Sequence, residues 1–264
     1  MNKKARNYCI SAFLISLCIL ACSCKKSEPP VSPLEGSGQA LLTIAESETV
    51  HTALLFAFHR AGERWIKDYT FPAVIGKNGL AWSRGLHADR DRDQSEPVKR
   101  EGDGKSPMGV FELLHAWGYL PPEKVSTRFP YSQADSSFIC IDDVRSEYYT
   151  MVVNMREKGL DPAALPSHET MLRDDDLYKY TILVGYNTSH PVKGAGSCIF
   201  LHLWGGEDSF TAGCTAISED SMLDLLAWLD PGKKPVIVQL TRKNYFRLRD
   251  SWNLPRIPGD LITR

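Results

Sequence analysis

The final third of the chain has the clearest pattern of hydrophobic positions. Three short apolar runs rich in β-branched residues predict strands at residues 180–185, 197–204 and 235–240. In the second run, the period of two places Cys198, Phe200, His202 and Trp204 on one face. We therefore expect His202 to project from the end of a strand.

Between the last two predicted strands, the spacing changes to that of a helix. Ser218 can cap its N-terminus, and Glu219 and Asp220 suit the positive end of its dipole. The expected buried stripe is Met222, Leu225, Leu226 and Leu229. Pro231 and Gly232 end the helix.

The first two thirds are less regular. Residues 40–59 mix helical and strand periods, and we interpret them as a helix followed by a strand. Residues 71–75 and 110–113 predict strands, and residues 76–79 predict a tight turn after the first of these.

Three segments lack such patterns. Residues 23–39 have few core-forming side chains and predict a flexible linker. Residues 85–104 alternate Arg and Asp, which indicates a solvated loop without a function of its own. Residues 121–177 predict an irregular lobe or insertion.

The N-terminal segment has the pattern of an export signal. Lys3, Lys4 and Arg6 precede a short apolar stretch that ends near Ala21. The run that ends at Cys22 resembles a bacterial lipobox, which makes residues 1–22 a lipoprotein-type signal peptide and Cys22 the expected lipid anchor. Simple secretion is the alternative. Both place the main part of the chain outside the cytoplasm, on the periplasmic side of the cell envelope.

Composition narrows the class of protein. The 264 residues carry a net charge of -1, which gives no basic surface for nucleic acid. Hydrophobic residues make up 43%, enough for a sizeable core. We expect one large β-rich domain over residues 40–264.

The strongest candidate for chemistry is Cys214. Gly213 before it lets a substrate carbonyl approach, and backbone N–H groups of this turn, with Thr211 nearby, can form an oxyanion hole. The loop of residues 205–210 can return the chain so that His202 accepts the thiol proton. The helix that follows can lower the thiol pKa.

The other cysteines and histidines carry less information. We favour packing of Cys140 and Cys198 as small apolar groups over pairing, which sequence alone leaves open. Spacing favours no metal site and no cofactor. His87 is expected to be exposed, and the remaining histidines are assigned no function: His51, His59, His115, His168 and His190.

Three ordered motifs resemble those of the YkuD-type L,D-transpeptidase family. They are Ser106-Pro107-Met108-Gly109-Val110-Phe111 within residues 98–111, the segments 185–187 and 196–202, and His202 followed by Thr211-Ala212-Gly213-Cys214. The likeness covers about residues 71–240.

The resemblance implies a mainly β fold of α+β class, a mixed sheet or sandwich with a groove and with a helix after the catalytic Cys. In this fold, Cys214 and His202 would act on peptidoglycan stem peptides through a thioester. Lys99 and Arg100 would then hold substrate carboxylates, or be plain surface charges, and Trp204 would line the groove or pack. Many family members have His at the position of Ala212, and Arg or Asn at that of Ala216. These departures leave two enzyme activities as alternatives, that of a transpeptidase and that of an L,D-carboxypeptidase or related hydrolase. A wall-binding lipoprotein without activity is the alternative from another class.

Overall fold

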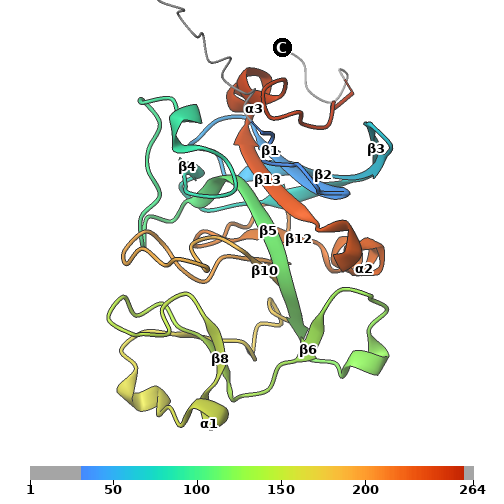
Figure 1. Cartoon of the computed structure of the whole chain (residues 1–264). Helices are drawn as coiled ribbons and strands as arrows, with labels where there is room; N and C mark the ends of the chain where they lie inside the picture. The colour runs from blue at the N-terminus through green and yellow to red at the C-terminus, as the bar shows by residue number, and fades with distance from the viewer. Residues whose placement is uncertain (1–30, 259–264) are drawn as a thin grey trace, which may run out of the picture. The chain divides into compact units, whose positions relative to one another are not determined.

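One large sheet dominates the computed structural model, which describes residues 31–258 (Figure 1). The sheet has ten strands in the order β10-β11-β12-β3-β2-β1-β13-β5-β4, with β6 paired to β5. The strands are β1 (Gln39–Ala45), β2 (Thr52–Ala61), β3 (Arg64–Val74), β4 (Leu80–Trp82), β5 (Ser106–Gly118), β6 (Tyr131–Gln133), β10 (Tyr180–Val184), β11 (Phe200–Leu203), β12 (Thr215–Ile217) and β13 (Val236–Thr241). Strand β10 also pairs with β5, so the path of pairings closes into a ring.

The sheet is mixed, as predicted. Strands β1 and β13 are parallel, as are β11 and β12, whereas β10 runs antiparallel to β11 and to β5. The parallel pair β11–β12 matters for the site because it brings Phe200–Leu203 alongside the residues that follow Cys214.

Residues 121–177, here called the lobe, contain more regular structure than the irregular lobe or insertion expected from the sequence (yellow-green in Figure 1). It holds a second sheet of three strands in the order β8-β7-β9. Its elements after β6 are β7 (Phe138–Cys140), β8 (Val152–Asn154), α1 (Met155–Lys158), a 3-10 turn at Pro162–Ala164 and β9 (Glu169–Thr170), and a further 3-10 turn at Pro122–Lys124 precedes β6.

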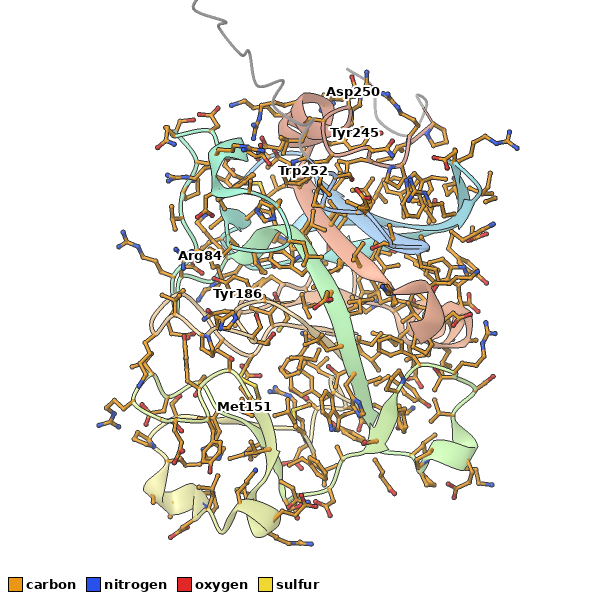
Figure 2. The ribbon with its side chains drawn as sticks, viewed as in Figure 1. Arg84, Met151, Tyr186, Tyr245, Asp250 and Trp252 are labelled. Atoms are coloured by element: carbon orange, nitrogen blue, oxygen red, sulfur yellow. A yellow bond between two sulfur atoms is a disulfide. The ribbon has the colours of Figure 1, made fainter. Side chains whose placement is uncertain are left out.

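Two longer helices pack on the main sheet. Helix α2 (Glu219–Trp228) begins as predicted, with Ser218 Oγ accepting the Ser221 N–H. Its stripe of Met222, Leu225 and Leu226 is buried in the first core cluster with Leu201 and Ile217. Helix α3 (Arg242–Leu248) packs in a second cluster, where Figure 2 shows Tyr245 near Trp252. Short 3-10 turns at Asp89–Asp91 and Pro231–Lys233 complete the list.

The prediction for residues 40–59 is wrong. A helix followed by a strand was expected, and the structure has two antiparallel strands, β1 and β2. All seven residues of β1 are buried, so β1 lacks the alternation of polar and apolar residues that identifies a half-buried strand.

The predicted linker ends earlier than residue 39. Leu34 is only 2% exposed and packs in the second core cluster, and β1 already begins at Gln39. The signal peptide, Cys22 and the linker up to residue 30 lie outside the described residues. Among the helices of residues 31–258, none is long and apolar enough to cross a membrane.

The other predicted strands are confirmed with adjusted bounds. Strands β3, β5, β10 and β13 lie where the apolar runs predict them, and Gly79 N–H closes the tight turn onto the Gly76 carbonyl. Strand β11 is shorter than the predicted 197–204, because residues 197–199 form an irregular segment in which Cys198 has a positive φ of 52°.

Candidate active site around Cys214

The turn that carries Cys214 is anchored on both sides. Thr211 donates its N–H to the Ile75 carbonyl at 3.0 Å, and its own carbonyl accepts the Lys77 N–H at 2.9 Å. The Thr211 hydroxyl donates to the Cys214 carbonyl at 2.6 Å. Gly213 is required here, since its φ is +156° and a Cβ would lie 3.0 Å from the Lys105 carbonyl oxygen.

This anchoring changes one expectation for the turn. The Gly213 N–H donates to Thr211 Oγ1 at 3.1 Å, so it is engaged inside the turn instead of pointing to an oxyanion. Thr211 thus holds both Gly213 and Cys214 through its hydroxyl, and its role in positioning the nucleophile stays a prediction. The hydrogen bonds of residues 31–258 include none from the backbone N–H of Cys214, which leaves that group for a substrate oxygen.

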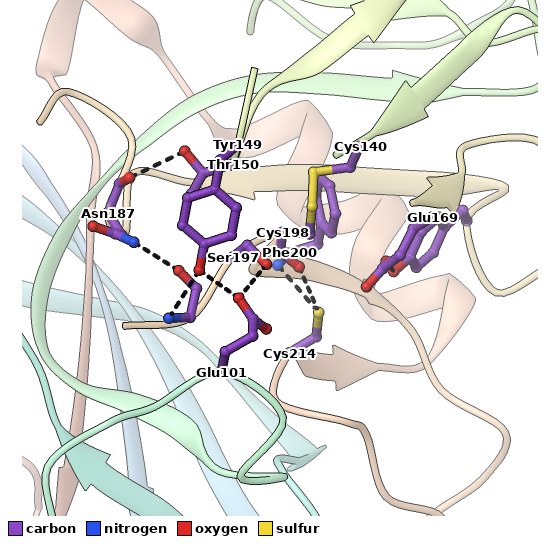
Figure 3. Close-up of a disulfide and its surroundings, with 12 residues drawn as sticks. Glu101, Cys140, Tyr149, Thr150, Glu169, Asn187, Ser197, Cys198, Phe200 and Cys214 are labelled. Carbon is purple, nitrogen blue, oxygen red and sulfur yellow. Dashed lines mark hydrogen bonds between the residues drawn. A yellow bond between two sulfur atoms is a disulfide. The ribbon is translucent and has the colours of Figure 1, made fainter. Parts of the chain in front are cut away.

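The Cys214 thiol lies against the start of β11. The Phe200 N–H donates to Cys214 Sγ at 3.3 Å, and the thiol donates to the Cys198 carbonyl with Sγ 3.5 Å from the oxygen (Figure 3). The side chain is 7% exposed. Burial, and then the charge of Glu169, raise the pKa of Cys214 to about 12, which is opposite to the lowering expected from the helix. The resting thiol is therefore protonated.

His202 lies on β11, two residues after Phe200. It is buried, and its Nδ1 donates to the Leu203 carbonyl at 2.7 Å. Because a carbonyl only accepts, Nδ1 carries the hydrogen, and Nε2 is the lone-pair nitrogen that can take a proton. Burial lowers the pKa of His202 to about 4, so the ring is neutral.

His202 lies on β11 and Cys214 lies directly before the neighbouring strand β12, without a hydrogen bond between the two side chains. Ala216, two residues after Cys214, is the parallel partner of His202. Among the hydrogen bonds of the described residues, none joins His202 to Cys214. A dyad that is loose before substrate binds is compatible with proton transfer once substrate is in place.

Sequence reasoning missed Tyr178 and Glu169, which complete this side of the site. The Tyr178 ring packs 5.4 Å from the Phe200 ring and 5.1 Å from the His202 ring. Its hydroxyl donates to Glu169 Oε2 at 2.5 Å. Burial raises the pKa of Glu169 to about 7 and raises that of Tyr178. Glu169 comes from β9 in the lobe, where the sequence has no periodic signal.

The expectation that Cys140 and Cys198 pack without pairing is wrong. They form a disulfide that connects residues 58 positions apart (Figure 3). It ties β7 of the lobe to the segment directly before β11. Since the Cys198 carbonyl accepts the Cys214 thiol, the covalent link lies next to the candidate nucleophile.

Glu101 makes a second connection between the lobe and the main sheet. Its Oε2 accepts the hydroxyls of Tyr149 at 2.5 Å and Ser197 at 2.7 Å, and the Gly196 N–H donates to Tyr149 Oη at 3.3 Å (Figure 3). Glu101 belongs to the charged loop of residues 85–104, to which we assigned no function. That loop supports one wall of the site.

Two further predictions for this loop are corrected. Lys99 is 5% exposed, and its Nζ donates to Asp103 Oδ1 at 2.6 Å and to the Arg100 carbonyl at 2.8 Å, so it is not available for a substrate carboxylate. His87 is buried instead of exposed, because its Nδ1 accepts the Val110 N–H at 3.1 Å and its ring packs on Trp82.

The remaining candidates lie at the edges of the site. Arg100 is exposed. Trp204 is half-buried, and its backbone N–H donates to the Ile217 carbonyl. A cavity of about 400 Å³ next to Lys99 is lined by Trp82, Arg84 and Tyr186 among others, and Figure 2 shows the last two on the same side of the molecule. No group of three or more His, Cys, Asp and Glu within residues 31–258 is placed to hold a metal ion.

Comparison with known proteins gives one family. The model of the YkuD family, described as the L,D-transpeptidase catalytic domain, matches residues 52–238. No curated protein matches the chain. A solved structure of Bdellovibrio bacteriovorus Bd1075 is similar at 16% identity with a TM-score of 0.38; the match covers 85% of this chain and 58% of that one. The chain thus spans less than two thirds of that protein's length.

Proposed function

Because the chain belongs to the L,D-transpeptidase catalytic domain family, we propose that it is an exported cysteine L,D-transpeptidase acting on peptidoglycan stem peptides through a thioester on Cys214. One observation carries the assignment to this residue. Cys214 is the free cysteine of the described chain, and its Sγ is held by the Phe200 N–H on the strand that presents His202.

The first half-reaction forms the acyl-enzyme. His202 Nε2 takes the thiol proton while Cys214 Sγ bonds to the carbonyl carbon of the stem peptide. Because the resting thiol is protonated, proton removal and C–S bond formation occur together. The C–N bond then breaks, and the leaving amine takes the proton from His202. The Cys214 backbone N–H stabilises the developing oxyanion.

The second half-reaction decides the product. An amine nitrogen attacks the thioester carbon, the C–S bond breaks, and sulfur recovers a proton through His202. The result is a new peptide cross-link. When water attacks instead, the product is a trimmed stem peptide, which is the L,D-carboxypeptidase alternative.

Export is part of the proposal. The Cys140–Cys198 disulfide supports it, since such bonds persist in oxidising compartments. We also propose that Cys22 carries the lipid anchor and holds the enzyme at the periplasmic side of the cell envelope.

The test is a product assay on purified muropeptides with and without an added amine. We expect a thioester on Cys214 by mass spectrometry and cross-linked or exchanged product when amine is present. Cys214→Ser should form neither, and His202→Ala should slow acylation by about 10²–10⁴-fold. Trimmed product alone would favour the hydrolase. Full turnover by Cys214→Ser, or binding to cell wall without any turnover, would overturn the proposal.

A further inference from the structure

Glu169 is a carboxylate at the site that the mechanism above does not use. Its Oε2 accepts the Tyr178 hydroxyl at 2.5 Å, and the hydrogen bonds of residues 31–258 include none to Oε1. The carboxylate thus has one oxygen fixed in place and a second one available to a ligand.

Tyr178 connects this carboxylate to the reacting groups. Its ring packs against Phe200, whose N–H donates to Cys214 Sγ, and against the His202 ring. The Glu169 charge raises the pKa of Cys214, whereas the Tyr178 hydroxyl lowers it. Figure 3 shows Glu169 and Cys214 in the same close-up beside the disulfide. Glu169 is therefore linked to the site through the Tyr178 ring, and its charge acts on the Cys214 thiol.

The charges around Glu169 favour a cation over an anion. Asp142 and Glu101 both act on it with negative charge. The nearby cation Arg173 is held by Asp175 at 2.5 Å, and Lys99 is held by Asp103 at 2.6 Å. Since both cations have their own partners, a negative surplus remains on the lobe side of Cys214, which attracts an ammonium group and repels a carboxylate.

We propose that Glu169 binds the ammonium group of the acyl acceptor and takes one of its protons. This inference rests on the proposed transfer reaction and assigns the residue that receives its amine acceptor, which arrives protonated. One N–H proton passes to the Glu169 carboxylate, and the freed nitrogen pair bonds to the thioester carbon. The C–S bond breaks with its electrons on sulfur, the second N–H proton goes to His202 and then to sulfur, and Glu169 returns its proton to water.

Tyr178 is the positioning residue for this carboxylate. Its hydrogen bond fixes Oε2, and cation–π packing of Arg173 at 5.0 Å holds the ring from the other side. Removing the hydroxyl should let the Glu169 carboxyl move while the charge remains.

The experiment compares two acceptors on the full-length enzyme with a muropeptide donor. Nα-acetyl-lysine amide supplies an ammonium group, and hydroxylamine supplies an uncharged nucleophile. We expect Glu169→Gln, which keeps the shape of the side chain, to lower kcat/KM for the lysine derivative by about 100-fold. Because the Glu169 charge raises the pKa of Cys214, the substitution also alters acylation of Cys214, and that change affects both acceptors equally. The ratio of kcat/KM for the lysine derivative to that for hydroxylamine should therefore fall by about 100-fold. Tyr178→Phe should mainly raise KM for the lysine derivative.

Glu157→Gln is the matched control, because Glu157 is an exposed carboxylate of the same lobe. It should leave all rates unchanged. Equal loss with both acceptors, or no loss with either, overturns the role of Glu169 while the Cys214 thioester still supports the proposed function. Absence of any acyl-enzyme in the unmodified protein overturns both. If Glu169→Gln fails to fold, KM of the Tyr178→Phe variant is measured for both acceptors. A rise for the lysine derivative alone supports the role of Glu169, and an equal change for both acceptors overturns it.

Discussion

Ser106 Oγ donates a hydrogen bond to the Cys214 carbonyl at 2.8 Å, across a sequence separation of 108 residues. The same oxygen accepts the Gly76 N–H at 2.9 Å. Ser106 is completely buried at the start of β5. One hydroxyl thus joins the turn after β3, the first residue of β5 and the backbone of the candidate nucleophile.

Ser106→Ala should weaken the fold and misplace the thiol. The substitution leaves the buried Gly76 N–H without a partner, which costs about 1–3 kcal/mol of unfolding free energy. We expect that loss in denaturant unfolding, together with slower acylation of Cys214. Ser136→Ala, at an exposed position, should match the unmodified protein in both measurements. Unchanged acylation in Ser106→Ala would show that the turn keeps its geometry without this bond.

Removing the disulfide should loosen the lobe and expose Cys214. The double substitution Cys140→Ala and Cys198→Ala should lower the free energy of unfolding by about 2–5 kcal/mol. Because the Cys198 carbonyl accepts the Cys214 thiol, losing the tether should also speed alkylation of Cys214 by iodoacetamide. Mass spectrometry of the Cys214 peptide separates this label from labels on the other cysteines. Equal alkylation rates would mean that the lobe stays in place without the covalent link.

Three groups with shifted pKa values give the stability a pH dependence with opposing signs. Burial lowers the pKa of His87 and His202 from 6.5 to about 4, so between these values the unfolded chain binds more protons and stability falls as the pH falls. Burial raises the pKa of Glu169 from 4.5 to about 7, so in that window the folded chain binds the extra proton and stability falls as the pH rises.

Glu169→Gln removes the opposing contribution and leaves the two histidines. Between pH 5 and 6.5, the variant should therefore lose stability on acidification more steeply than the unmodified protein, by about 1 kcal/mol per pH unit. Chemical unfolding at several pH values measures the two slopes. Parallel curves would mean that Glu169 titrates in the folded protein as it does in the unfolded chain.

Leu34 tests whether the folded domain begins before residue 39. Leu34→Ala removes a side chain buried in the core with α3, so it should cost about 2–5 kcal/mol of unfolding free energy. Val31→Ala is the control, since Val31 is 75% exposed. If both variants unfold at the same denaturant concentration, Leu34 does not belong to the core.

Local patterns predicted the elements that have one buried face. Helix α2 was predicted from its cap and stripe because its polar positions face solvent while Met222, Leu225 and Leu226 face the sheet. Strand β1 was not predicted as a strand, because a strand buried on both faces has no alternating pattern of polar and apolar residues. The same lack of contrast hid Leu34, one apolar residue within a stretch rich in Ser, Gly and Glu.

In the site, the sequence pointed to Cys214, His202 and the Thr211 turn, which lie in two neighbouring segments. It could not show Glu169 hydrogen-bonded to Tyr178 beside the His202 ring, since that arrangement depends on how the lobe folds back on β11. The burial of Lys99 depends on distant residues too, although its partner Asp103 lies four positions away. The part of the site that the sequence predicts depends on local segments, and the part that it misses depends on contacts between distant segments.

The closed path of strand pairing also limits how a peptide can dock. Strand β11, which carries His202, has β10 on one side and β12 on the other, and β10 is itself closed by β5. Within residues 31–258, β11 therefore has no free backbone edge, and the stem peptide of the proposed reaction does not pair with this strand by β-augmentation. For the proposed reaction, we expect recognition next to β11 to come from side chains and loop amides, so that single substitutions in the lobe change substrate choice without disturbing the main sheet.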